Sequence, residues 1–229
     1  YLVILTLLVR LVWFFYISGI SEINFFYTDS IGYYQLAENI LSGNPYSLAG
    51  EEPFYSDVFR TPVLPIILIS CFLNIRTFLF IQIIISVLTV IFLYRLAHRM
   101  TGDKKIAFTA GLLVAFDVPT VVFANMIMTE TYYTFFLLMS VYQLVIWKEN
   151  GRKKHLLLSS VFFGLTAMTR PIGIFLPLFI LPLLWMINRK KKIPVLKGNL
   201  LFLLPFGFIT GSWIVRNYIV FGSFFFSHI

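Results

Sequence analysis

The chain has 229 residues, of which 59% are hydrophobic and only 12% are charged. Because about a quarter of an ordinary globular chain is charged, this composition excludes a soluble domain. The net charge of +8 is better explained by short basic loops beside anionic lipid than by nucleic-acid binding. The single cysteine, Cys71, excludes an internal disulfide and is expected to be a packing residue.

Most basic and most acidic residues lie in different segments of the chain. Thirteen of the eighteen Lys and Arg lie in three short clusters between apolar segments, at residues 95–105, 148–154 and 189–197. Seven of the ten acidic residues lie elsewhere, in two stretches around Asp29 and Glu130. Since basic loops stay on the cytoplasmic side of a membrane, we expect the carboxylates to face the opposite, outer side.

A membrane-spanning helix needs about 20 consecutive apolar residues. The segments that approach this length are residues 1–20, 77–94, 106–125, 131–147, 155–169, 172–188 and 199–215. Residues 62–75 are shorter and contain Pro62 and Pro65, so we expect this segment to be re-entrant or to lie along the surface. Seven spans with a cytoplasmic N-terminus then place the basic clusters inside and the acidic stretches outside. The sequence predicts an all-α polytopic protein of the cell membrane, with one domain over residues 1–229.

Residues 21–60 are expected to form an outward loop that carries amphipathic juxtamembrane helices. The stretch DSIGYYQLAENILSG has Asp29 at its start, Gly43 at its end and Pro45 beyond it, which is typical of a capped helix. Helical spacing places five apolar residues on one face: Tyr33, Leu36, Ala37, Ile40 and Leu41. We expect this helix to lie on the outer membrane surface with that face in lipid.

Two carboxylates are candidates for chemistry on the outer face. Asp29 serves either as a helix cap or as a general base at the membrane surface, and both roles remain open. Glu130 in MTETYY lies where two predicted spans meet the outer surface. Since a carboxylate beside hydrocarbon is costly, Glu130 is hydrated, paired or coordinating a ligand. A hydrated residue at a helix entry is the competing interpretation.

Three arginines also lie on the outer side, against the usual preference for basic residues inside. They are Arg60 in FRTP, Arg170 in AMTRP and Arg216 in SWIVRN. Snorkelling commonly explains one arginine at an interface, whereas three on one side indicate an anion there. Because a guanidinium binds phosphate in a forked geometry, a phosphate head group is the predicted ligand.

The remaining polar candidates are isolated. Arg10 and Asp117 lie at depth in predicted spans, and a structural ion pair between them is the favoured interpretation. His228, near the end of the chain, is a candidate ligand or proton carrier.

Taken in order, these motifs resemble the GT-C membrane glycosyltransferases, most closely glycosyltransferase family 39. That family includes the protein O-mannosyltransferases and the bacterial lipid A aminoarabinose transferases. The resemblance extends over nearly all of the chain and implies that it is the N-terminal catalytic half of a longer protein. It implies a polyprenyl-phosphate-linked sugar donor and an active site on the outer face. The chain departs from the family pattern at Ser30, which follows Asp29 where some members have a second acid. This departure weakens the assignment of a divalent metal ion.

The resemblance further implies roles for particular residues. Asp29 matches the catalytic base, Glu130 the acidic residue of the second outward loop, and Arg60 the basic residue that meets the lipid phosphate. Glu130 would orient the acceptor or Asp29, or hold a divalent ion. His228 falls in a region where some members place a site residue. The further candidates are Arg170 and Arg216 for the phosphate, and Tyr33.

The implied reaction is inverting transfer of a sugar to a lipid, glycan or protein acceptor, and no nucleic-acid partner is expected. Two alternatives remain open from the residues alone. One is a transporter or flippase of polyprenyl-linked lipids, which would need polar groups at mid-membrane depth such as Arg10 and Asp117. The other is a non-catalytic membrane scaffold subunit, which would tolerate loss of Asp29 and Glu130.

Overall fold

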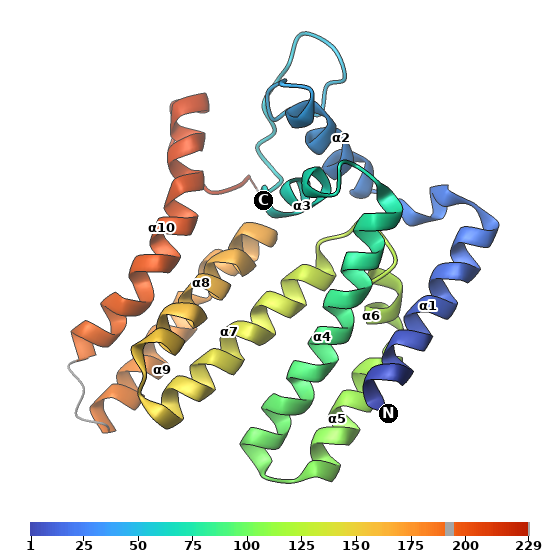
Figure 1. Cartoon of the computed structure of the whole chain (residues 1–229). Coiled ribbons are helices and arrows are strands. Elements are labelled where there is room, and N and C mark those ends of the chain that lie inside the picture. Colours follow the sequence, from blue (N-terminus) through green and yellow to red (C-terminus); the bar gives the residue numbers. More distant parts are fainter. Residues whose placement is uncertain (191–194, 229) are drawn as a thin grey trace. The chain divides into compact units, whose positions relative to one another are not determined.

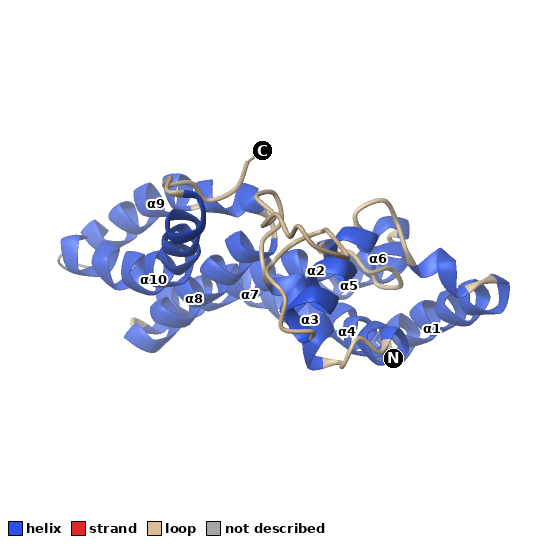
Figure 2. Ribbon diagram, turned by 90° about the horizontal axis from the view of Figure 1, so that it is seen from above, coloured by secondary structure: helices blue, strands red, loops and turns tan. Residues whose placement is uncertain are grey.

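The computed structural model describes residues 1–190 and 195–228, and these form helices and no strand (Figures 1 and 2). Residues 191–194, in the third basic cluster, lie outside the described residues. In chain order the α-helices and 3-10 helices (η) are α1 (Leu2–Ile20), η1 (Glu22–Phe25), α2 (Ser30–Leu41), α3 (Val63–Ser70), α4 (Ile75–Thr101), α5 (Lys104–Phe116), α6 (Val118–Phe123), α7 (Glu130–Asn150), α8 (Lys153–Thr169), η2 (Pro171–Phe175), α9 (Pro177–Lys190) and α10 (Val195–Phe221).

The contacts of the chain group into two compact units, which are described separately. The first unit consists of Tyr1–Asp57 and Pro62–Phe135. The second consists of Val58–Thr61 and the chain from Phe136 onward. Helices α1 to α6 therefore belong to the first unit, and helices α8 to α10 to the second.

Three of the described helices are long and apolar enough to cross a membrane: α1, α4 and the Leu196–Phe221 part of α10. The apolar stretch Pro171–Ile187 is shorter. Large apolar side chains project from these helices without being buried, as Val12 does on α1 (68% exposed) and Phe208 on α10 (80% exposed). Because lipid tails are as apolar as such side chains, this surface suits a bilayer, and the chain is a helical membrane protein.

The predicted segment 106–125 is not one helix. It is interrupted at Asp117, where α5 ends and α6 begins. The Asp117 carboxylate accepts a hydrogen bond from the Thr120 backbone N–H at 3.0 Å and so caps α6, with Pro119 in the first turn. The short segment 62–75 forms α3, whose eight residues extend about 12 Å, too short to cross a bilayer alone.

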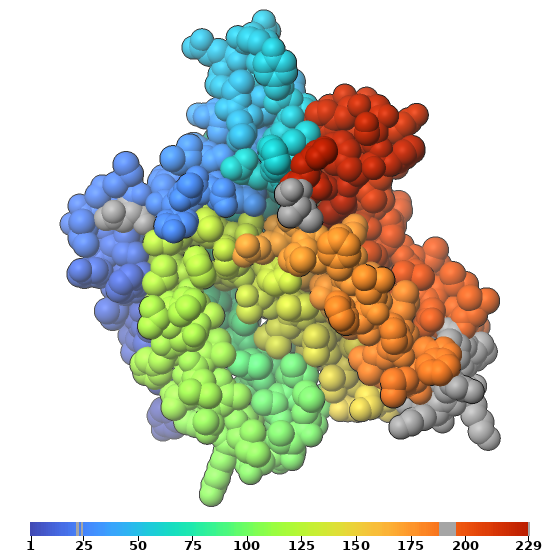
Figure 3. Space-filling model, turned by 180° about the vertical axis from the view of Figure 1, so that it is seen from behind, coloured from blue at the N-terminus to red at the C-terminus, as the bar shows by residue number. Residues whose placement is uncertain are grey.

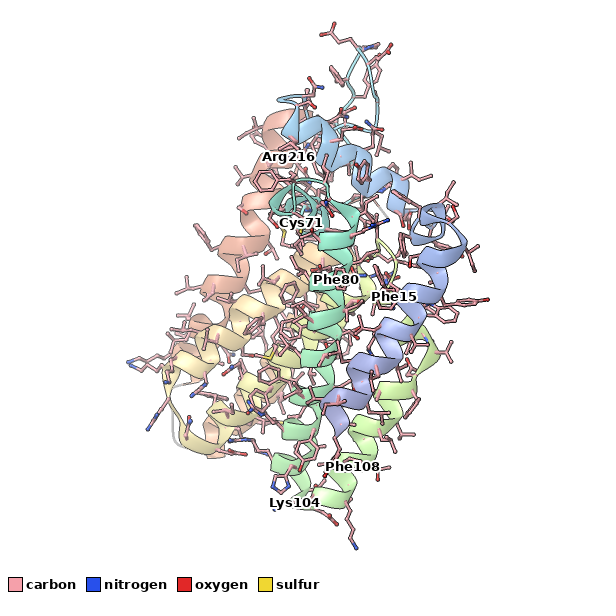
Figure 4. All side chains as sticks on the ribbon, turned by 45° about the vertical axis from the view of Figure 1, so that its right-hand side comes forward. Phe15, Cys71, Phe80, Lys104, Phe108 and Arg216 are labelled. Carbon is pink, nitrogen blue, oxygen red and sulfur yellow. The ribbon has the colours of Figure 1, made fainter. Side chains whose placement is uncertain are left out.

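In the first unit, α1 packs along α4 and α5. The blue surface of α1 lies beside the green surface of α5 and α6 in the space-filling view (Figure 3). At the α1–α4 contact, the ring of Phe14 meets that of Phe80 with centroids 5.0 Å apart, and Phe15 lies close by (Figure 4). The same figure shows Cys71 and Lys104 near opposite ends of α4.

Arg10 joins three helices of the first unit. Its side chain is fully buried and donates hydrogen bonds to Ser86 Oγ on α4 (3.0 Å), and to the backbone oxygens of Ala115 (2.6 Å) and Val114 (3.2 Å) at the end of α5. The last carbonyls of a helix have no partners within it, and the break at Asp117 creates such an end inside the unit. The predicted pairing of Arg10 with Asp117 is electrostatic, and the hydrogen bonds of each residue cap one side of the break.

In the second unit, α8 packs along α10. Its core consists of Leu144, Trp147, Leu156, Phe163, Ala167, Leu184, Phe202 and Phe206. The Ser160 hydroxyl of α8 donates to the Phe202 backbone oxygen and accepts from the Phe206 backbone N–H at 2.9 Å. These two backbone groups pair with each other in a regular α-helix, and they flank Pro205, which has no N–H to donate. Ser160 thus supports α10 at its proline.

Candidate functional site

Asp29 lies at the start of α2, as predicted, but its side chain makes no capping hydrogen bond to the helix. The local hydrogen bond is made by Ser30 instead, whose hydroxyl accepts from the Tyr27 backbone N–H at 2.8 Å. The Asp29 side chain is exposed. The interpretation of Asp29 as a side-chain cap is therefore wrong, and its carboxylate lies on the surface of the first unit.

Helix α2 is held on the first unit by its buried face. Leu36 and Ala37 are fully buried, and α2 packs against α3, whereas Ile40 and Leu41 of the predicted apolar face are exposed. Two of the five residues of that face therefore contact protein where lipid was expected. The helix ends as predicted at Gly43, whose φ of +80° is the left-handed conformation that glycine adopts without strain.

Two hydrogen bonds fix the loop that follows α2. The Asn39 side chain amide is buried and donates to the backbone oxygens of Ser47 at 2.6 Å and Ala49 at 2.8 Å. The outward loop is thereby folded back onto the last turn of α2.

Glu130 is the first residue of α7, at the end of a loop that leads out of α6. Gln82 of α4 is fully buried and its side-chain amide donates to the backbone oxygens of Phe123 (2.7 Å) and Met126 (2.5 Å) in this loop. The Ile127 backbone N–H donates to the Phe25 backbone oxygen at 3.0 Å. This last bond lies four residues before Asp29 and three before Glu130, so it ties together the two segments that present the carboxylates.

A cavity of about 210 Å³ opens beside Glu130, within the first unit. Its polar lining comes from α4, α6 and α7 and consists of Ser86, Thr89, Thr120, Glu130, Thr131 and Thr134. Thr134 is exposed, so the cavity reaches the surface of the unit. Sequence reasoning missed this cavity, because hydroxyl residues in membrane helices commonly bond to their own helix.

The arginine candidates lie in the second unit. Arg60 belongs to the short segment Val58–Thr61, which pairs with the end of the chain. The His228 backbone N–H donates to the Val58 oxygen at 3.0 Å, and the Ser227 hydroxyl donates to the Phe59 oxygen at 2.7 Å. The exposed His228 ring packs on Phe225, with centroids 4.5 Å apart. His228 and Arg60 are thus neighbours through their backbones, which their sequence separation did not predict.

Arg216 is braced near the end of α10 (Figure 4). Its guanidinium lies 4.8 Å from the centroid of the Trp213 ring and donates to Asn217 Oδ1 at 2.8 Å. Asn217 is buried, and its amide donates to the backbone oxygens of Phe225 (3.0 Å) and Phe226 (3.1 Å). Asn217 therefore holds the terminal segment that reaches Arg60, and Arg216 is connected to that segment through Asn217.

Arg170 is exposed and follows α8 directly, between the predicted spans 155–169 and 172–188, and Pro171 opens η2. The turn is tight, because a Cβ on Gly173 would lie 2.6 Å from the Cα of Ala167. Only glycine fits this approach of η2 to α8, and it fixes the direction in which the chain leaves Arg170.

The described residues contain no group of three or more His, Cys, Asp or Glu that could hold a metal ion. Gln82, which positions the loop before Glu130, was missed by sequence reasoning. A glutamine inside an apolar span is the signal that could have found it, since buried amides are generally hydrogen-bonded.

A comparison with protein families matches residues 62–210 to the family described as dolichyl-phosphate-mannose-protein mannosyltransferase. The match includes Glu130 and Arg170 and begins two residues after Arg60; Asp29, Arg216 and His228 lie outside it. Comparisons with curated proteins and with solved structures give no match. The family match covers well over half of the chain. The resemblance to family 39 is thereby confirmed, and the chain belongs to the dolichyl-phosphate-mannose-protein mannosyltransferase family of membrane glycosyltransferases.

Proposed function

We propose that the protein transfers a sugar from a polyprenyl-phosphate-linked donor to an acceptor hydroxyl on the outer face of the cell membrane, with inversion at the anomeric carbon. The observation that carries the reaction class is the family match over residues 62–210. The acceptor is a lipid, a glycan or a protein.

Asp29 is the general base in this proposal. Its exposure at the start of α2 supports the assignment, because a base must reach the acceptor. The acceptor oxygen forms a bond to the anomeric carbon and passes its proton to Asp29, while the bond from that carbon to the phosphate oxygen breaks. The electron pair of that bond leaves with polyprenyl phosphate. Attack opposite the leaving group inverts the anomeric configuration.

Arg60 carries the charge that grows on the leaving phosphate, with Arg170 or Arg216 as a second contact. The support is local: the Arg60 segment and the Arg216–Asn217 pair are joined through the end of the chain. His228, next to that junction, and Tyr33, one turn after Asp29 on α2, are secondary candidates for substrate contacts. Glu130 accepts hydrogen bonds from substrate hydroxyls. A metal ion has no ligand set among the described residues, and no step is assigned to one.

The proposed topology has about seven spans with the N-terminus in the cytoplasm. Its support is the position of the basic residues in the sequence together with α1, α4 and α10, which are long enough to cross. The junction of α4 and α5, with Arg99 in the last turn of α4 and Lys104 at the start of α5, then faces the cytoplasm, and Asp29 and Glu130 face outward.

The transporter alternative loses its candidates. It depended on Arg10 and Asp117 as a polar pathway, whereas both are occupied in capping the break between α5 and α6. A scaffold subunit would keep its function when Asp29 or Glu130 is replaced, whereas the enzyme would lose its activity.

The test is sugar transfer from a panel of polyprenyl-phosphate sugars in membranes that carry the protein. We expect Asp29→Asn to lower turnover by about 10²–10⁴-fold, the usual contribution of a general base, at unchanged expression and melting temperature. Glu38→Gln is the matched control, because Glu38 is an exposed carboxylate on the same helix. Near-normal turnover of Asp29→Asn would contradict the assignment, and no transfer by the wild type from any donor would contradict the proposed function.

A further inference from the structure

The cavity beside Glu130 lies deep in the first unit. Its α4 lining begins at Ser86, eleven residues after the first residue of α4, or about 16 Å along the helix axis. Polar groups at such a depth in a membrane protein are costly unless they serve a polar partner. Six of the nine lining residues carry a polar group and the rest of the lining surface is apolar, which fits a ligand that has both hydroxyl groups and apolar C–H faces.

The size of the cavity admits one sugar ring. An apolar cavity of about 150 Å³ in a protein interior holds a benzene molecule. At about 210 Å³, the present cavity has room for a six-membered ring with hydroxyl substituents. It is too small for a chain of several sugars or for a prenyl tail.

The hydrogen-bonding groups of the lining indicate which kind of polar ligand the cavity favours. The Thr89 hydroxyl donates to the Ile85 backbone oxygen at 2.9 Å, and the Thr120 hydroxyl donates to the Asp117 backbone oxygen at 2.9 Å. Having used their protons, these two hydroxyls offer lone pairs to the cavity, as the Glu130 carboxylate does. These three acceptor groups favour a ligand that has O–H donors and disfavour a phosphate.

Two other hydroxyls complete the wall. Ser86 Oγ accepts from Arg10 Nε at 3.0 Å and keeps its own proton to donate. Thr131 is 7% exposed and lines the cavity, next to Glu130 in the chain. Its hydroxyl can both donate to and accept from a ligand there. Pro119 and Phe123 add apolar surface for the C–H face of a ring.

We infer that this cavity binds the sugar ring of the lipid-linked donor, with Thr89, Thr131 and Glu130 contacting its hydroxyl groups. The inference rests on the proposed function for the identity of the donor. A sugar carried on a lipid reaches the cavity from the bilayer, while its phosphate remains outside the cavity.

The test measures steady-state kinetics of Thr89→Val and Thr131→Val, which remove a hydroxyl at nearly constant shape. Each lost hydrogen bond contributes about 0.5–1.5 kcal/mol, so the donor KM is expected to rise about 2- to 12-fold while the acceptor KM stays constant. Thr101→Val is the control, since Thr101 bonds to its own helix in the same way but lies at the far end of α4. Deoxy donors extend the test: an analogue lacking the contacted hydroxyl should show no further loss with the variant.

A second readout separates this inference from the proposed function. It compares the melting temperature of the protein with bare polyprenyl phosphate and with polyprenyl-phosphate mannose. We expect the sugar to add stabilisation that Thr131→Val removes, even if no acceptor is known and no transfer is seen. The inference is overturned if both variants keep the donor KM and the sugar-dependent stabilisation, or if the change appears in the acceptor KM instead.

Discussion

Replacing Arg10 with methionine tests whether this buried arginine is the cap of α5. Methionine fills similar space but donates no hydrogen bond, so the backbone oxygen of Ala115 loses its donor, whereas that of Val114 still accepts from the Thr120 hydroxyl at 3.1 Å. A buried acceptor left unsatisfied costs about 1–3 kcal/mol. Part of this is offset because the charged guanidinium no longer has to be buried. We expect a net loss of about 1–2 kcal/mol, which for a chain of this size lowers Tm by about 2–8 °C.

The assay is thermal unfolding in detergent, followed by size-exclusion chromatography of the remaining folded protein. Leu8→Met is the control, because Leu8 is exposed on the same helix, and it should melt like the wild type. Arg10→Lys should fall between the two, since an ammonium is a point donor that cannot span Ser86 and both backbone oxygens as the planar fork does. A Tm of Arg10→Met within about 1 °C of the wild type, the range of a neutral substitution, would refute the reasoning.

Two further substitutions test the loop that presents Glu130. Gln82→Met removes the donors to the Phe123 and Met126 backbone oxygens, so we expect the free energy of unfolding to fall by about 1–3 kcal/mol and sugar transfer per folded molecule to fall as well. Unchanged transfer per folded molecule would show that the loop keeps its conformation without Gln82. Tyr132→Phe, on the first turn of α7, removes a buried hydroxyl that has no hydrogen-bond partner within the described chain. We expect Tm to be unchanged or raised, and a clear fall in Tm would show that this hydroxyl does have a stabilising partner.

The sequence predicted most elements of the fold because each carries its own signal. Helix α2 lies within residues 29–43, with Asp29 and Gly43 at the expected ends, and the proline-rich segment 62–75 forms only a short helix. Local rules of capping and length decide such features, and they can be read without knowing the neighbours.

The break at Asp117 escaped the hydropathy pattern for a physical reason. The residues on both sides are apolar, so the average over a span is insensitive to one helix end. The local signal was nevertheless present, since an aspartate followed within two residues by proline is a helix start. Once the break is recognised, Arg10 acquires a second role beside its electrostatic interaction with Asp117, as the cap for the end of α5.

The positioning residues of the candidate site could not be predicted in the same way. Gln82 acts on a loop more than forty residues later in the chain, and Asn217 acts on a segment that folds back from beyond α10. Such pairs depend on tertiary packing alone. The roles assigned to Asp29, Glu130 and the three arginines remain predictions of the sequence and of the resemblance.

Ser160 has a consequence for how the second unit is assembled during synthesis. Membrane helices generally satisfy their own backbone before they pack, but α10 contains Pro205 and relies on the α8 hydroxyl at Phe202 and Phe206. Helix α8 is synthesised before α10, so the hydroxyl is already in place when α10 enters the bilayer. For this helix, completing the backbone hydrogen bonds and docking on its neighbour are therefore a single event.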